Sequence, residues 1–313
     1  MAADNVATLD PRLFDEDDNA EDLSYKQIIN SVLTQKASPV QAAARIDDWV
    51  VGESNRRYNE LKQREPPFSL TDEEKDSIYL VGPNPSRQIS MIVGAIARVC
   101  SAYPPGHPVQ DALVGLFQAL KAMPKHEVPD LSYDEESNEP SFERKLALWP
   151  FGTPSVEYLA QKFQREAEEL AYPFSEVETP GSEFQLRWKN LQGFISRLTS
   201  LDLIDCSIAS ALEYILPTHY AYPDLDKRPQ GGPNRIEADL IAAAQWLEPD
   251  QPRQWVYNQC RSTAVGDGMR QIWSMDKWNL FKEQLSFFSS DERFSQETRR
   301  LAESLREKME TQG

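Results

Sequence analysis

Three carboxylates interrupt an apolar stretch in the second half of the chain. The stretch 201–216 reads LDLIDCSIASALEYIL and contains Asp202, Asp205 and Glu213. Carboxylates beside a hydrophobic core can act as general acids or bases, bind a metal ion, or cap a helix. Which role applies depends on the partners that the rest of the chain supplies.

Helical periodicity favours capping for two of these acids. On a helix over 202–216 the apolar residues share one face, with Asp202 and Glu213 far from its centre and Asp205 closer to it. Asp202 then fits the N-cap and Asp205 the first turn, where free backbone N–H groups and the helix dipole favour a carboxylate. We therefore predict a helix over 202–216 that begins at Asp202.

An arginine on the preceding segment is a candidate partner for Asp205 or Glu213. In SEFQLRWKNLQGFISRL (182–198), Arg187 falls near the centre of the apolar helix face. A buried guanidinium needs an acceptor. Only three residues separate the two predicted helices, so we expect them to pack antiparallel and to bring Asp205 or Glu213 to Arg187. Such a buried pair is either structural or anchors a ligand, and the sequence leaves both interpretations open.

Aromatic residues suggest where a pocket would lie. Trp188 is on the Arg187 segment, and the stretch YILPTHYAYPD (214–224) places His219 and Tyr220 where the predicted helix ends. Ligand pockets combine aromatic walls with a few polar groups. We therefore expect a pocket, if one exists, at this exit loop and the Arg187 face.

Motifs for cofactor or metal chemistry are absent. The three histidines have no metal-ligand spacing, and no phosphate-binding glycine loop follows a strand. The cysteines, Cys100, Cys206 and Cys260, are odd in number, far apart and without CxxC spacing. We expect no cofactor, no metal and no disulfide framework.

Acidic doublets leave a third interpretation open, that of a magnesium-dependent cyclase. Helical prenyl-diphosphate enzymes hold Mg²⁺ with aspartate-rich motifs, and Asp47-Asp48 is the nearest match here. No further acid follows the doublet until Glu53, and carboxylates favour helix starts without any metal. We rank this interpretation below the others.

The elements that must position these residues are predicted to be helices. Ser38-Pro39 is a typical helix entry, and TDEE (71–74) has capping-box spacing. No stretch alternates over the length that a strand needs. We predict an all-α fold, an irregular array of about eleven to thirteen helices in a single domain. Besides 202–216, the predicted C-terminal helices cover about 155–171, 182–198, 234–247, 252–262, 275–289 and 291–311.

Charge and composition divide the chain into four segments. The net charge is −17, of which residues 1–23 carry −7 (eight acids, one arginine) and residues 127–143 carry another −7 (seven acids). We predict an acidic disordered tail over 1–23, helical halves over 24–122 and 155–311 that pack as one domain, and an acidic, proline-rich loop over 123–154. Without a basic stripe, we expect no nucleic-acid partner.

The order of these elements resembles a fungal family of proteins of unknown function. The resemblance rests on SPVQAAARIDDWV, MIVGAIARVCSAYPPGHPVQDALVGLFQAL, WKNLQGFISRL, ALEYIL, AAAQWL, MDKWNLFKEQLSFF and RRLAESLREKM, and it spans about residues 24–310. It implies a soluble, helical, fungal protein. It supplies no active-site residues.

Two hypotheses of function follow. In the first, the protein binds a small, largely apolar molecule between helices, in fungal specialised metabolism, with any catalysis being cofactor-free acid–base chemistry. In the second, it is a helical interaction scaffold whose acidic loop contacts a basic protein partner. The longest apolar run, 91–97, is too short for a membrane span, so we expect no membrane partner and a cytoplasmic location.

Overall fold

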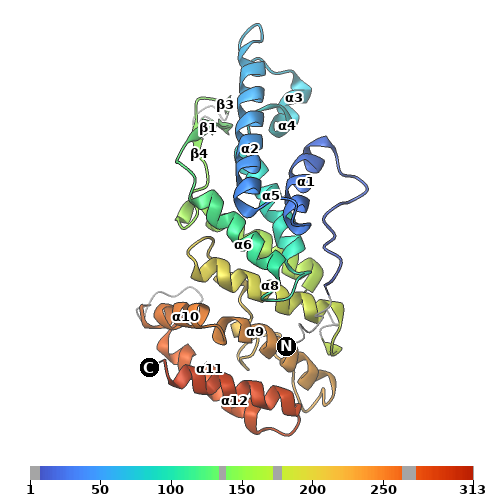
Figure 1. Ribbon diagram of the computed structural model, residues 1–313, viewed down its shortest axis with the longest axis vertical. Coiled ribbons are helices and arrows are strands. Elements are labelled where there is room, and N and C mark those ends of the chain that lie inside the picture. The colour runs from blue at the N-terminus through green and yellow to red at the C-terminus, as the bar shows by residue number, and fades with distance from the viewer. Residues whose placement is uncertain (1–7, 134–138, 172–177, 263–272, 313) are drawn as a thin grey trace. The chain divides into compact units, whose positions relative to one another are not determined.

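The all-α prediction is confirmed by the computed structural model (Figure 1), of which 64% is helical. It describes residues 8–133, 139–171, 178–262 and 273–312. The twelve α-helices of these residues agree with the predicted number. The contacts form two compact units. Unit 1 comprises the described residues of Met1–Pro11, Ala97–Gln110 and Phe163–Gly313, and unit 2 comprises Arg12–Ile96 and Asp111–Lys162. That the predicted halves pack as one domain stays a prediction.

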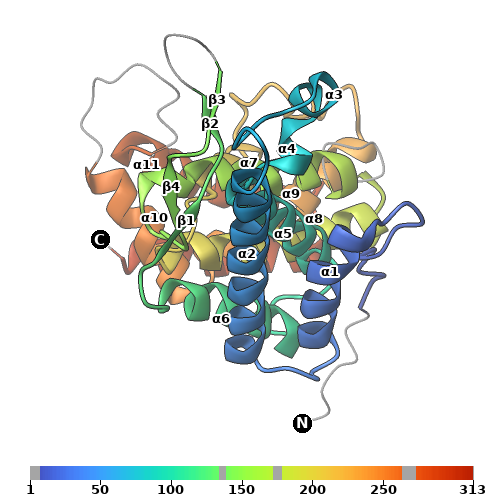
Figure 2. The ribbon, with the colours of Figure 1, turned by 90° about the horizontal axis from the view of Figure 1, so that it is seen from above.

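Unit 2 is built around the long helix α2, which spans Pro39–Lys62 (Figure 2). Ser38 caps this helix, Pro39 is its first residue, and Gln41 completes a capping box, as the sequence predicts. The other whole helices of the unit are α1 (Ala20–Leu33), α3 (Asp72–Asp76) and α4 (Ile78–Val81). The unit also contains parts of α5 (Pro85–Cys100), α6 (Pro108–Lys121) and α7 (Ala160–Glu166).

The acidic segment 123–154 differs from the predicted loop, because it pairs with itself. Strand β1 (Glu127–Pro129) pairs antiparallel with β4 (Lys145–Ala147), and β2 (Ser132–Tyr133) pairs with β3 (Pro140–Ser141). Strands of two or three residues are too short to show alternation in the sequence. A 3₁₀ helix, η1 (Pro154–Leu159), follows β4. Residues 134–138 of the acidic segment lie outside the described part of the chain.

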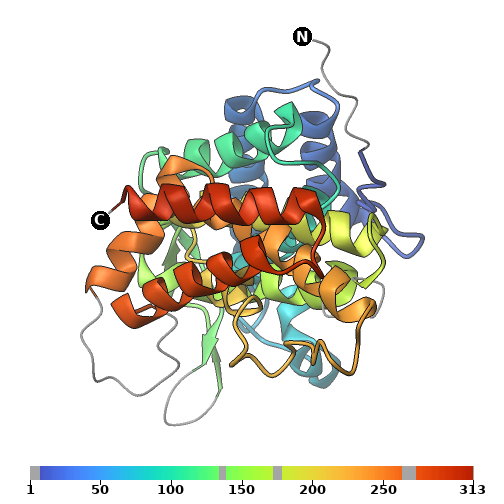
Figure 3. The same ribbon diagram turned by 90° about the horizontal axis from the view of Figure 1, so that it is seen from below.

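Unit 1 holds the C-terminal helices (Figure 3). Helix α8 packs against α9, and α11 packs against α12 after a short turn. The elements are η2 (Ala167–Ala171), α8 (Glu183–Ser200), η4 (Ser207–Ala209), η5 (Ala211–Glu213), α9 (Gly231–Leu247), α10 (Asp250–Ser262), α11 (Met275–Ser290) and α12 (Gln296–Glu310). Ser182 and Ser274 cap α8 and α11 where the predicted helices begin.

The predicted helix over 202–216 is wrong. Asp202 has a φ of 54° in the turn that ends α8, and only the short 3₁₀ turns η4 and η5 follow. The buried side chain of Gln192 binds this segment at two points. Its Nε2 donates to Ala209 O (2.7 Å) and its Oε1 accepts from Ala211 N (2.9 Å). A side chain therefore takes the place of helical hydrogen bonds here, which periodicity alone does not reveal.

Residues 8–23 differ from the predicted disordered tail. Leu13 is 4% exposed, and Asn19 forms a capping box that begins α1 at Ala20. The buried ammonium of Lys26 lies 3.1 Å from Asp15 and 2.5 Å from Asp18. The acids of this segment thus serve as partners and caps, which composition alone cannot distinguish from a solvated tail. Residues 1–7 are outside the described part.

Candidate functional site

An apolar pocket in unit 2, which we call the aromatic pocket, is a candidate site. Its volume is about 240 Å³. Its walls come from the start of α5, from β4, from the turn after β4 and from η1. The lining residues are Ser86, Ile89, Leu146, Ala147, Trp149, Pro150, Phe151, Ser155, Val156 and Tyr158. None of these side chains carries a formal charge at neutral pH, so the pocket is suited to an uncharged molecule.

Trp149 forms the central wall through an unusual backbone conformation. Its φ is 56°, a left-handed value that costs a bulky residue roughly 1–2 kcal/mol. The side chain is 5% exposed and packs against Phe151, with ring centroids 6.2 Å apart. Phe151 in turn meets Phe117 of α6 edge-on at 5.4 Å. Burial and ring packing offset the cost of the strained backbone.

Asp47 of α2 fixes the orientation of the Trp149 ring. The indole Nε1 donates to Asp47 Oδ1 at 2.6 Å. The same oxygen lies 2.9 Å from His126 Nε2, an ion-pair distance when the imidazole is protonated, although the ring is not aligned for a hydrogen bond. The acidic doublet considered as a magnesium motif is thus engaged at Asp47, while Asp48 is exposed.

Hydroxyl groups supply the polar side of the aromatic pocket. Burial raises the pKa of the Tyr158 hydroxyl, with a smaller contribution from Asp130, so it stays protonated as a donor at neutral pH. Asp130 is 1% exposed and is held by two hydrogen bonds from Arg144. Ser86 and Ser155 complete the set. These groups can orient a ligand by hydrogen bonds.

Arg187 does not meet either predicted acid. It is 0% exposed and lies on α8. Its Nε donates to Glu183 Oε1 (2.7 Å), its Nη1 to Ser101 Oγ (3.0 Å) and its Nη2 to the carbonyl of Asp10 (2.6 Å). The guanidinium is thus enclosed and hydrogen-bonded by other partners. The predicted pairing with Asp205 or Glu213 is wrong, because the segment after α8 is not an antiparallel helix.

The two candidate acids lie apart from Arg187. Asp205 is exposed and accepts from Ser207 N at 2.9 Å, which starts the first 3₁₀ turn. Glu213 lies 3.7 Å from Lys277 Nζ of α11. An aspartate that accepts from the backbone N–H two residues further on forms a local turn, whereas the predicted role of Asp205 was in the first turn of a helix.

The three predicted aromatic residues do come together. Trp188 meets Tyr214 edge-on at 5.7 Å, Tyr214 lies 4.2 Å from His219, and His219 lies 4.5 Å from Tyr220. The row runs from Trp188, which is 1% exposed, to Tyr220, which is 86% exposed. Tyr214 joins the predicted residues, since it bridges Trp188 and His219.

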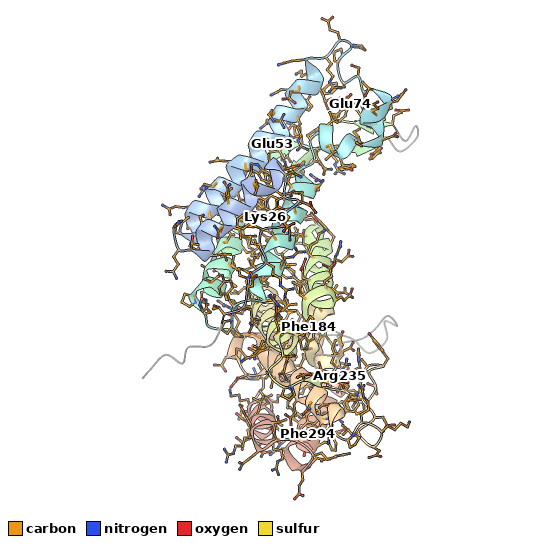
Figure 4. The ribbon with its side chains drawn as sticks, turned by 90° about the vertical axis from the view of Figure 1, so that its right-hand side faces the viewer. Lys26, Glu53, Glu74, Phe184, Arg235 and Phe294 are labelled. Atoms are coloured by element: carbon orange, nitrogen blue, oxygen red, sulfur yellow. The ribbon has the colours of Figure 1, made fainter. Side chains whose placement is uncertain are left out.

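Asp239, a buried acid beside this row, is not among the predicted site residues. Asp239 is 1% exposed and accepts from Trp188 Nε1 at 3.2 Å. It lies 3.8 Å from Nε of Arg235, the α9 residue that is labelled in Figure 4. Burial raises the pKa of Asp239 to about 7, while Arg235 and the indole N–H oppose the shift. The available signal was an acid four residues after an arginine in the run RIEADLIAAA, which is apolar from Leu240 on.

The aromatic pocket and the Asp239 cluster belong to different units, and the family comparison covers much of both. A family described as protein of unknown function (DUF3632) matches residues 93–285, more than half of the chain. The chain belongs to this family. The DUF3632 match includes the pocket residues from Leu146 to Tyr158, but not Ser86 and Ile89 on α5. No curated protein and no solved structure matches the chain.

Two further observations concern all described residues of this DUF3632 protein. No helix of the described residues is both long enough and apolar enough to cross a membrane. Within the same residues, no three side chains of histidine, cysteine, aspartate or glutamate form a group that could hold a metal ion. A protein partner for the acidic loop stays a prediction.

Proposed function

We propose that this protein binds a small, uncharged, largely apolar molecule in the aromatic pocket. The supporting observation is the absence of any charged side chain from the lining, in a chain whose net charge is −17. Burying an ionised ligand among such residues would remove it from water without an opposite charge. An uncharged ligand avoids this cost.

Size and shape narrow the proposed ligand to a compact ring system. The pocket volume of about 240 Å³ lies just below the range of roughly 300–1,000 Å³ that drug-sized ligands occupy. The faces of Trp149 and Phe151 are suited to a flat ring. Burying about 200 Å² of apolar ligand surface contributes roughly 5 kcal/mol before the entropic cost of binding. The hydroxyl of Tyr158 would donate to a polar substituent.

Calorimetric titration with two matched probes tests this proposal. 2-Naphthol is uncharged at pH 7, and 2-naphthoate has a similar size but carries a negative charge. We expect 2-naphthol to bind at least about tenfold more tightly, because one buried polar group without a partner already costs on the order of 1–3 kcal/mol. Equal affinity for both probes would contradict the proposal.

A substitution that fills the pocket localises the binding. Ala147 lines the pocket and its side chain is exposed, so Ala147→Phe adds volume at the mouth without removing a core residue. We expect it to abolish 2-naphthol binding while the melting temperature stays within a few degrees of the wild type. Ala44→Phe, at an exposed position of α2, is the matched control and should bind as the wild type does.

A role in fungal specialised metabolism is part of the same proposal and rests on the resemblance described above. The more specific form of this proposal is that the protein catalyses a cofactor-free acid–base reaction on the bound molecule. Genes for biosynthetic enzymes beside the gene for this protein would support the role. A neighbourhood of unrelated housekeeping genes would count against it.

A further inference from the structure

His126 is joined to the central wall of the aromatic pocket by two contacts. Its backbone carbonyl accepts from Leu148 N at 3.0 Å, and Trp149 follows Leu148 in the chain. From α2, Asp47 reaches both side chains, because its Oδ1 accepts from Trp149 Nε1 and lies 2.9 Å from His126 Nε2. A change at the His126 ring is therefore passed to the Trp149 ring through one carboxylate oxygen.

The contacts of the His126 ring fit the protonated imidazole. Nδ1 lies 2.8 Å from the carbonyl oxygen of Pro124, and because a carbonyl oxygen only accepts, Nδ1 carries the hydrogen. In the neutral ring Nε2 then has a lone pair. This nitrogen is inaccessible to solvent and lies beside Asp47 Oδ1, so its lone pair would face a carboxylate oxygen. A proton on Nε2 replaces that repulsion with an ion pair.

Among the described residues, Asp47 carries the one ionised group within ion-pair distance of the His126 ring. The charged residues next to His126 in the chain, and those nearby on α2 and β4, which pack against β1, are exposed: Lys125, Glu127, Arg45, Asp48 and Lys145. Solvent screens exposed charges. Asp47 is therefore the group that responds most strongly to the charge of His126.

The His126 ring can exchange protons with the solvent. Its side chain is 33% exposed, although Nε2 itself is covered. Histidine is the side chain whose charge ordinarily changes between about pH 5 and pH 8. His126 is the sole histidine of unit 2, since His107 and His219 belong to unit 1. A histidine titration in unit 2 therefore belongs to this residue.

From this arrangement we propose that His126 is a pH sensor that regulates the aromatic pocket, an inference that rests on the proposed function. The protonated ring holds Asp47 Oδ1 in place, and Asp47 holds the indole of Trp149. When the ring loses its proton, repulsion turns Asp47 away, and the indole loses its acceptor. Trp149 needs this support because a left-handed backbone at a bulky residue is maintained by its surroundings.

Thermodynamic linkage sets the direction of the effect. An ordered wall favours the protonated ring, and a bound ligand favours an ordered wall, so ligand and proton strengthen each other's binding. 2-Naphthol is uncharged from pH 5.5 to pH 7.5, and its own charge therefore does not contribute. We expect its affinity to fall about two- to fivefold over this range, as for a partly exposed ion pair.

The indole resonance of Trp149 tests the sensor in the ligand-free, full-length protein. In ¹⁵N-labelled protein this resonance is assigned by its loss in Trp149→Phe. We expect it to move between pH 5.5 and pH 8 with the same midpoint as the imidazole resonances of His126. An indole resonance that does not follow His126, or a His126 ring that does not titrate in this range, overturns the proposal.

Two matched variants assign the pH dependence. His126→Gln removes the titratable ring and keeps a side chain that can donate to Asp47. We expect the pH-dependent shift of the Trp149 indole to disappear and the affinity for 2-naphthol to be equal at pH 5.5 and pH 7.5. His219→Gln makes the same change in unit 1 and should retain both pH dependences.

Asp130 is a second group near the pocket with an altered titration. Burial raises the pKa of its carboxyl group, and Arg144 opposes the shift. Asp130 acts on Tyr158, another residue of the lining. A pH dependence that came from Asp130 would persist in His126→Gln, and such persistence would overturn the role of His126.

The two measurements also separate this proposal from the proposed function. If 2-naphthol bound at no pH, the proposed function would be contradicted, whereas the indole titration of the ligand-free protein would still decide whether His126 controls Trp149. If 2-naphthol bound equally tightly at pH 5.5 and pH 7.5 in the wild type, the proposed function would stand and the regulation by His126 would be overturned.

Discussion

Asp47 in unit 2 and Asp239 in unit 1 each accept a hydrogen bond from the indole N–H of a tryptophan. Asp47 accepts from Trp149 and Asp239 accepts from Trp188. They differ in surroundings, because Asp47 has a partly exposed side chain beside His126 whereas Asp239 is fully enclosed beside Arg235. Removing either acid leaves an indole N–H without its acceptor. At Asp239 the removal should also change how stability depends on pH.

At Asp239 we predict a pH-dependent penalty. Its pKa is raised from 3.8 to about 7, so the folded protein binds more protons than the unfolded protein between these values. The acid therefore costs no stability below 3.8, and its cost grows as the pH rises from 3.8 to about 7, above which it stays constant. Asp239→Asn should flatten the fall in unfolding free energy between pH 4 and pH 7, as measured by urea denaturation. A parallel pH profile in the variant would contradict the prediction.

At Asp47 we predict a loss of both stability and binding. Asp47→Ala removes the acceptor of the Trp149 indole, which should lower the unfolding free energy by about 1–3 kcal/mol and weaken 2-naphthol binding. Asp48→Ala changes the same charge at the neighbouring, exposed position and serves as the control. If the two variants behave alike, Asp47 does not position the pocket wall.

At the scale of elements, Gln192 decides the path of the chain after α8. It is 0% exposed and bonds Ala209, Ala211 and the indole of Trp246 at once. The segment 202–216 thus takes its 3₁₀ turns from a contact with a different helix. Local periodicity, which led to the prediction of an α-helix, carries no information about that contact.

The Gln192 contacts predict a large effect of one substitution. Gln192→Met keeps the volume but leaves three buried backbone or indole groups without a partner, so we expect a loss of about 2–4 kcal/mol in unfolding free energy. Gln118→Met, on the exposed face of α6, should change it by less than about 0.5 kcal/mol. If urea denaturation gave a similar loss of unfolding free energy for both variants, Gln192 would not determine the path of the segment 202–216.

Helix starts were predictable because their signals are local. Ser38-Pro39 and TDEE (71–74) each carry the cap within a few residues, and each forms the predicted cap. The β strands and the segment 202–216 depend instead on partners outside their own few residues. Helix caps could therefore be predicted from the sequence, whereas the short strands could not.

At the scale of the whole molecule, the sites depend on residues that are distant in sequence. The aromatic pocket joins Ser86 and Ile89 to residues 146–158, and its central wall depends on the left-handed backbone of Trp149. Neither feature has a signal in composition or periodicity. Trp188, His219 and Tyr220, which were predicted to line a pocket, lie in one row, and the pocket itself stays a prediction. The acid beside this row, Asp239, comes from a third segment.

The most direct test of the central claim is the position of a bound uncharged ring. In methyl-labelled protein titrated with 2-naphthol, we predict intermolecular nuclear Overhauser effects from the ligand ring to the methyl groups of Leu146, Ala147 and Val156, which line the aromatic pocket. Contacts confined to methyl groups outside this pocket, or no contacts at saturation, would contradict the account.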